Sequence, residues 1–93
     1  MNDVKSIRIT GTGDTTLNRA RVVGIHVFHD GVGAARLTLR ETGASGTVLL
    51  DLDFEAVADT TQISIPQSGI LFQDLVWASA FTNITAATIF YVG

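Results

Sequence analysis

Two histidines and an aspartate form the first group in this sequence that could carry out chemistry. His26, His29 and Asp30 are residue types that ligate metal ions. His26 and His29 are an odd number of positions apart in a segment that reads as a β-strand, so their side chains point to opposite faces. One ion could not be held by both. We therefore expect no metal site here and interpret the His29-Asp30 pair as ordinary chemistry at a turn.

A second candidate is the carboxylate pair Asp51 and Asp53, which alternate along one predicted strand and so share a face. Two carboxylates helped by loop carbonyls could bind calcium. An ion pair with Arg36 on the neighbouring strand explains the same residues without a bound ion. We favour the ion pair, with Asp53 as the partner of Arg36.

The segment Gly11-Thr12-Gly13-Asp14-Thr15-Thr16 resembles a fragment of a phosphate-binding loop. It lacks the lysine and the strand-to-helix context that such loops require, so we interpret it as a polar turn. Serine, histidine and acid do not occur in a nucleophile motif, and the chain has only 2 histidines to serve as a general base. The sequence therefore predicts a protein with no catalytic residues, no metal site and no cofactor.

Composition limits the remaining classes of function. The chain has 93 residues, of which 46% are hydrophobic and 16% charged, which is typical of a single folded domain over residues 1–93. Its net charge is −3 and its basic residues are scattered, so we expect no nucleic-acid binding. Cysteine is absent, so stability must come from packing. The first five residues lack the pattern of a secretory signal, and we expect synthesis in the cytoplasm.

The last part of the chain, residues 75–93, contains no charged residue. This length approaches that of a membrane-spanning helix. Polar residues interrupt it, however, and no basic residue flanks its end. We expect two uncharged strands and no contact with a membrane.

Threonine, valine and isoleucine dominate the sequence, and glycines separate the apolar runs. The predicted strands are Val4–Thr10, Arg21–His29, Ala35–Thr42, Thr47–Phe54, Thr61–Ile65, Ile70–Trp77 and Ala87–Val92, with a loop or helical turn over Glu55–Thr60. Short strands at this spacing are typical of sandwiches and barrels. We predict an all-β fold, a single antiparallel β-sandwich of the jelly-roll or Ig-like type with about seven to eight strands.

One hairpin register pairs apolar residues with each other on one face of the middle strands and polar residues with each other on the opposite face. If residues 43–46 form a loop closed by Thr42 opposite Thr47, all four leucines of the two strands share one face. The predicted pairs are Leu39 with Leu50, Leu37 with Leu52, Arg36 with Asp53 and Thr38 with Asp51.

For the preceding connection, a loop of Gly31-Val32-Gly33 would place Val27 opposite Leu37 and Ile25 opposite Leu39. The predicted core is Val23, Ile25, Val27, Leu37, Leu39, Val48, Leu50, Leu52 and Phe54. The predicted outer face is Val22, His26, Phe28, Arg36, Thr38, Arg40, Leu49, Asp51 and Asp53.

Several strands are apolar on both faces, among them residues 70–77 and 89–92. A sandwich of this size has one interior, so the second apolar face suggests burial against another subunit. We expect a homo-oligomer, with a trimer as the first hypothesis. The candidate interface residues are Phe28, Leu49, Leu71, Trp77, Phe90 and Tyr91. As an alternative, Trp77, Tyr91 and Phe28 could stack on sugars, which would make the chain a carbohydrate-binding module for receptor or glycan recognition.

Three segments resemble those of small structural proteins of tailed bacteriophages: residues 46–52, residues 65–72 and residues 87–93. These are a hydrophobic hairpin strand, an isoleucine-proline turn leading into a Gly69-Ile70-Leu71-Phe72 strand, and a closing strand that contains Tyr91. The resemblance implies a virion protein of the capsid decoration, knob or neck type, made in the host cytoplasm. It also implies docking on phage capsid or neck proteins, and it supplies no site residues.

Overall fold

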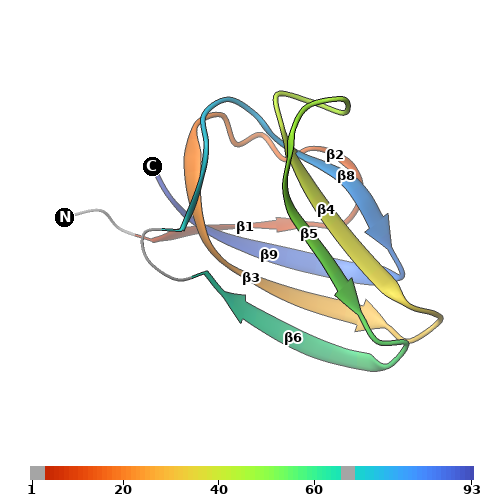
Figure 1. Ribbon diagram of the computed structural model, residues 1–93. Coiled ribbons are helices and arrows are strands. Elements are labelled where there is room, and N and C mark those ends of the chain that lie inside the picture. Colours follow the sequence, from red (N-terminus) through yellow and green to blue (C-terminus); the bar gives the residue numbers. More distant parts are fainter. Residues whose placement is uncertain (1–3, 66–68) are drawn as a thin grey trace.

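The computed structural model describes residues 4–65 and 69–93, which form nine strands in two packed antiparallel sheets (Figure 1). The strands are β1 (Lys5–Ile9), β2 (Gly13–Asp14), β3 (Ala20–Asp30), β4 (Ala35–Glu41), β5 (Val48–Phe54), β6 (Ala58–Ser64), β7 (Ile70–Phe72), β8 (Val76–Thr82) and β9 (Ile84–Val92). Within these residues there is no helix that could span a membrane. The predicted all-β sandwich is confirmed.

The strand order is that of a jelly roll. Sheet A runs β1-β9-β3-β6, with β7 paired to the start of β3, and sheet B runs β2-β8-β4-β5. With β7 set aside, the pairs are nested: β1 with β9, β2 with β8, β3 with β6 and β4 with β5. A chain folded back on itself as one long ribbon and then wrapped into two sheets gives this nesting. Of the two predicted sandwich types, the pairing selects the jelly roll.

A one-residue turn moves the chain from sheet B to sheet A between β8 and β9. Asn83 occupies this turn with φ of 55°, a left-handed conformation that asparagine tolerates better than most residues. Its carbonyl oxygen accepts a hydrogen bond from the Asp30 amide at 3.0 Å, and its Nδ2 donates to the Ala34 carbonyl at 3.1 Å. The uncharged C-terminal stretch therefore forms two strands, as predicted, and these lie in different sheets.

The predicted β4–β5 register is correct over the five pairs from Ala35–Phe54 to Leu39–Leu50 and then shifts by one residue. Arg40 lies opposite Val48, so Leu49 is the extra residue of a β-bulge. The bulge overturns two assignments. Val48, predicted in the core, is 40% exposed, while Leu49, predicted on the outer face, packs half-buried against the core.

The predicted hairpin between β3 and β4 is wrong, because these strands lie in different sheets. Val27 is paired with Thr61 and Ala87, and Leu37 with Leu52 and Phe81. The side chains predicted to be neighbours in one sheet, Ile25, Val27, Leu37 and Leu39, are nevertheless all fully buried. They enter one core from two layers.

A second bulge reverses the predicted faces at the start of β3. The register against β9 shifts between Val22 and Gly24, so Val22, predicted on the outer face, is fully buried, while Val23, predicted in the core, is half-buried. The predicted core residues Leu50, Leu52 and Phe54 are half-buried and pack against the core, because β5 is the edge strand of sheet B.

Most strand ends lie within one residue of the prediction, and the larger differences are in four places. The predicted loop 55–60 ends earlier, because β6 begins at Ala58, and β9 begins at Ile84. The predicted strand 70–77 divides into β7 and the start of β8, and the two-residue strand β2 was not predicted. Pro66, Gln67 and Ser68 of the isoleucine-proline turn lie outside the described residues, as do Met1, Asn2 and Asp3.

Gly46 closes the β4–β5 hairpin where no side chain fits. A Cβ atom at this position would lie 1.6 Å from the Glu41 carbonyl oxygen, whereas one at Gly11 would meet nothing within 4 Å. We expect Gly46→Ala to lower the free energy of unfolding by about 2 kcal/mol, because the hairpin must open to admit the methyl group. Gly11→Ala, the matched control, should change it by less than about 0.5 kcal/mol. Urea denaturation measures both, and equal effects would contradict the hairpin geometry.

Candidate functional site

The six predicted interface residues do not share one surface. Three of them lie on strands of sheet A between neighbours that face inward, so their side chains point to the outer face of that sheet. Trp77 points to the outer face of sheet B in the same way. The remaining two are half-buried and pack against the core. The outward group of sheet A is Phe28, Leu71 and Phe90, and the pair packed against the core is Leu49 and Tyr91.

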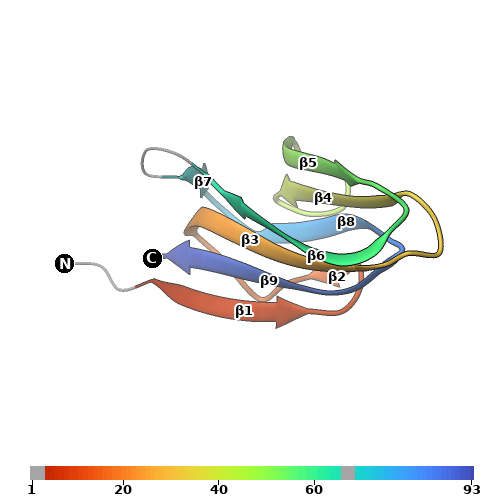
Figure 2. The ribbon, with the colours of Figure 1, turned by 90° about the horizontal axis from the view of Figure 1, so that it is seen from below.

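The outer face of sheet A combines aromatic and polar side chains. Phe90 lies opposite Gly24, and its ring carbon Cδ2 is 3.7 Å from the place that a glycine Cβ would occupy, so the ring covers the bare backbone of β3. One row across the sheet consists of Arg8, Thr88, His26 and Gln62. Figure 2, seen from below, shows this sheet in front, with no described segment lying over it.

Phe28 extends this face toward the end of β3. Its neighbours Val27 and His29 are buried, while Phe28 is 43% exposed and lies opposite the small residues Thr60 and Ala86. An exposed phenylalanine between small residues leaves a flat apolar area that a partner can cover. Phe28 is therefore the most accessible aromatic side chain of the predicted interface set.

At the opposite end of the same sheet, Arg21 lies between Leu71 of β7 and Val92 of β9. These residues line a hollow of about 150 Å³, together with Arg19, Ala20 and Gly93. Apolar walls beside two guanidinium groups suit a partner that offers an apolar side chain and a carboxylate.

The outer face of sheet B carries polar groups that bond mainly to one another. Arg36 donates to both carboxylate oxygens of Asp51, with distances of 3.0 Å from Nε and 2.8 Å from the terminal nitrogen, and the Thr38 hydroxyl donates to Asp51 at 2.8 Å. These hydrogen bonds lower the pKa of Asp51 to about 2. The predicted ion pair forms, but with Asp51: the assignment to Asp53 is wrong because the Arg36 side chain reaches diagonally across the strands.

The proposed sugar-stacking platform is not assembled. Trp77 points outward from sheet B, opposite Arg40 and Asp14, whereas Phe28 points outward from sheet A and Tyr91 packs against the core. A sugar ring could not stack on all three at once.

His29 is a buried structural residue of β3, which corrects its interpretation as turn chemistry. Its Nδ1–H donates to the Val57 carbonyl, its Nε2 is 3.0 Å from the Thr61 hydroxyl, and its ring stacks on Phe54 with 5.4 Å between centroids. His26 lies on the other face of the strand, as predicted. The hollow beside His29 measures about 290 Å³. Among residues 4–65 and 69–93, no three His, Asp or Glu side chains are grouped to hold a metal ion.

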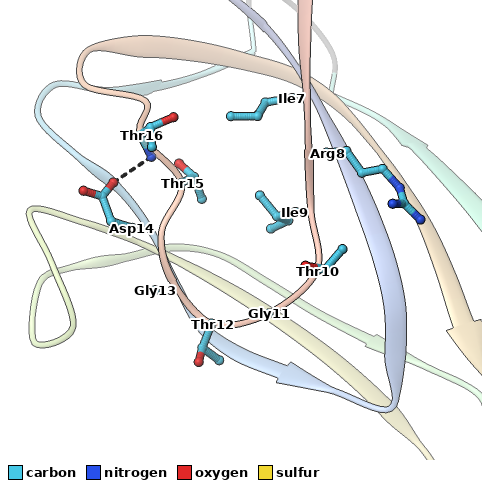
Figure 3. Close-up of a pocket in the computed structure, with 10 residues that line it drawn as sticks. All are labelled: Ile7, Arg8, Ile9, Thr10, Gly11, Thr12, Gly13, Asp14, Thr15 and Thr16. Carbon is cyan, nitrogen blue, oxygen red and sulfur yellow. Dashed lines mark hydrogen bonds between the residues drawn. The ribbon is translucent and has the colours of Figure 1, made fainter.

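Residues 11–16 also line a hollow, of about 380 Å³, shown in Figure 3. Asp14 accepts a hydrogen bond from the Thr16 amide at 2.7 Å, and Thr15 is buried with its hydroxyl donating to the Val76 carbonyl at 2.8 Å. Arg8 points away from the hollow. Gly13 and Asp14 form the short strand β2, which pairs with β8, so the interpretation of the whole segment as a polar turn is only partly correct.

Comparison of the chain with protein-family models, with curated proteins and with solved structures finds no match.

The Arg36–Asp51 pair predicts a pH dependence of stability. Because the pKa of Asp51 falls to about 2 on folding from an ordinary 3.8, the unfolded chain binds the proton more readily between these values. The pair therefore stabilises the fold above pH 3.8, and this contribution is lost as the pH falls toward 2. In thermal melts over this range, Asp51→Asn should flatten the rise of Tm with pH. Asp53→Asn, a matched change on the same strand, should leave more of this rise of Tm with pH. A larger flattening in Asp53→Asn than in Asp51→Asn would contradict the assignment of Asp51 as the partner of Arg36.

The buried position of His29 predicts that replacing it destabilises the fold much more than replacing His26. We expect His29→Ala to lower the free energy of unfolding by about 3 kcal/mol, since it removes a buried ring and leaves the Val57 carbonyl without its donor. His26→Ala on the outer face should cost less than about 1 kcal/mol. Urea denaturation of both variants measures the difference, and similar losses would show that His29 does not anchor the residue 55–57 connection.

Proposed function

We propose that this chain is a virion structural protein, a capsid decoration or cement protein that docks on a phage particle through the outer face of sheet A. One observation carries the proposal: an uncovered sheet face on which Phe28, Leu71 and Phe90 alternate with polar side chains. Interface cores are enriched in aromatic side chains, and arginine and hydrogen-bonding groups provide specificity around them.

The architecture supports this proposal by analogy. Viral capsid proteins and lectins both use the jelly-roll strand order. Fold alone does not establish function, so the exposed face and the sequence resemblance to phage structural proteins are the stronger support. Repetition on a shell would strengthen attachment, because many weak contacts act together.

The sequence also raised a glycan-binding alternative, for which the structure offers no shared aromatic platform. A protein-docking face fits the described side chains better, since its apolar groups are spread across several strands and its polar groups form rows between them. Binding on a glycan array that is lost in Trp77→Ala would favour the alternative.

Co-sedimentation tests the proposal, with particles assembled from the capsid proteins encoded in the same genome. We expect the wild-type chain to pellet with the particles and Phe28→Ser to bind about tenfold more weakly, because an exposed aromatic anchor is lost. Val48→Ser is a matched control, since Val48 is 40% exposed, close to the 43% of Phe28, but lies on the edge of sheet B. Wild-type protein that stays in the supernatant, or equal loss in both variants, would contradict docking through sheet A.

A further inference from the structure

We propose that copies of this chain bind one another end to end, through two different surfaces at opposite ends of the sandwich. The first surface, the loop end, consists of Asp30, Val32, Glu55, Val57 and Asp59. The second, the basic end, consists of Arg19, Arg21, Leu71 and Val92. This contact goes beyond the proposed docking on a particle: Leu71 belongs to both surfaces, but self-association of the purified chain is tested without particles.

The loop end presents two valines held on tight turns. Val32 is 82% exposed and Val57 is 49% exposed. The Val32 amide donates to the Asp30 carboxylate at 2.9 Å, and the Val57 carbonyl accepts from the buried His29 ring. Because both turns are fixed by hydrogen bonds, placing the valines in a partner costs little ordering entropy.

The two turns form one projection. Asp30 pairs with Ala58, and a Cβ at Gly31 would lie 2.7 Å from the Ala58 amide, so the connections after β3 and after β5 touch. Three carboxylates lie within two residues of the valines along the chain, on Asp30, Glu55 and Asp59, and all three residues are exposed. The one ion pair among the described residues joins Arg36 to Asp51, so it neutralises none of these carboxylates.

The basic end offers the complementary features. Arg21 separates Leu71 from Val92, and the three line the hollow of about 150 Å³ with Arg19 beside them. Neither arginine joins the ion pair of the described residues. A projection that carries two valines and three carboxylates fits a hollow lined by Leu71, Val92 and two guanidinium groups, both by hydrophobicity and by charge.

A second copy is the occupant that this complementarity selects, because each chain carries both halves of the contact. Figures 1 and 2 show the start of β3 and the C-terminus at one end and the β3–β4 and β5–β6 connections at the other. The longest dimension of the molecule is 38 Å. A contact between unlike surfaces does not stop at two copies: it continues into a ring or an open row.

Charge reversal tests the contact. We expect purified wild-type protein to show a concentration-dependent series of oligomers by light scattering coupled to size exclusion, and to dissociate as salt rises toward 1 M, where screening shortens to about 3 Å. Glu55→Arg with Asp59→Arg should weaken association at least about tenfold, and so should Arg19→Glu with Arg21→Glu. Each double variant alone sets like charges against each other.

Mixing these two double variants is the decisive measurement. The reversed loop end of one then faces the reversed basic end of the other, so association should return. Arg8→Glu, a charge reversal away from both ends, should leave assembly unchanged. A wild type that is monomeric at all concentrations, oligomers that resist both reversals, or a mixture that stays monomeric would each overturn the proposal.

The absence of cysteine allows a second test that does not depend on affinity. A chain with both Val32→Cys and Val92→Cys should give a ladder of products with a short thiol-reactive cross-linker, since the two positions lie at opposite ends of one molecule and meet only between molecules. Circular dichroism confirms that the variants fold. Products no larger than those of Val32→Cys alone would contradict the end-to-end arrangement. Particle binding is measured separately, so either proposal can fail without the other.

Discussion

The two sheets are held together by one buried cluster to which β3 and β4 contribute the central side chains. Ile25 and Val27 enter it from sheet A, and Leu37 and Leu39 from sheet B. Burying four aliphatic side chains of this size contributes several kcal/mol, at about 1.5–3 kcal/mol each. Both outer faces keep their spacing only while this cluster holds, so the position of Phe28 depends on residues that lie on the opposite side of the same strand.

The sequence predicted the fold class and the direction of most side chains, because alternation along a strand determines which face each side chain occupies. It could not tell a hairpin from a crossover after Asp30, since Gly31-Val32-Gly33 is compatible with both. The faces of Ile25 and Leu37 are the same in either case. The pairing partners of a strand depend instead on the topology of the two sheets, which is determined by contacts between residues far apart in the chain.

The candidate surface was predicted less completely, and bulges explain much of the difference. An extra residue at Leu49 turned a predicted interface residue toward the core, and a register shift beside Val23 exchanged the faces of two valines. Leu49 has no glycine or proline beside it, whereas Gly24 directly follows Val23, and a glycine inside a predicted strand is a signal for a bulge. The buried role of His29 also had no local signal, because its partners Val57 and Thr61 come from a different part of the chain.

The position of β9 between β1 and β3 has a consequence for how the protein reaches its structure. Sheet A has no continuous set of strands until residues 84–92 are available to join its first strand to its third. The apolar faces of β1 and β3 therefore stay uncovered until β9, which is synthesised much later, pairs with both strands. Such non-local pairing slows folding, and it places all-β domains of this kind in the millisecond-to-second range.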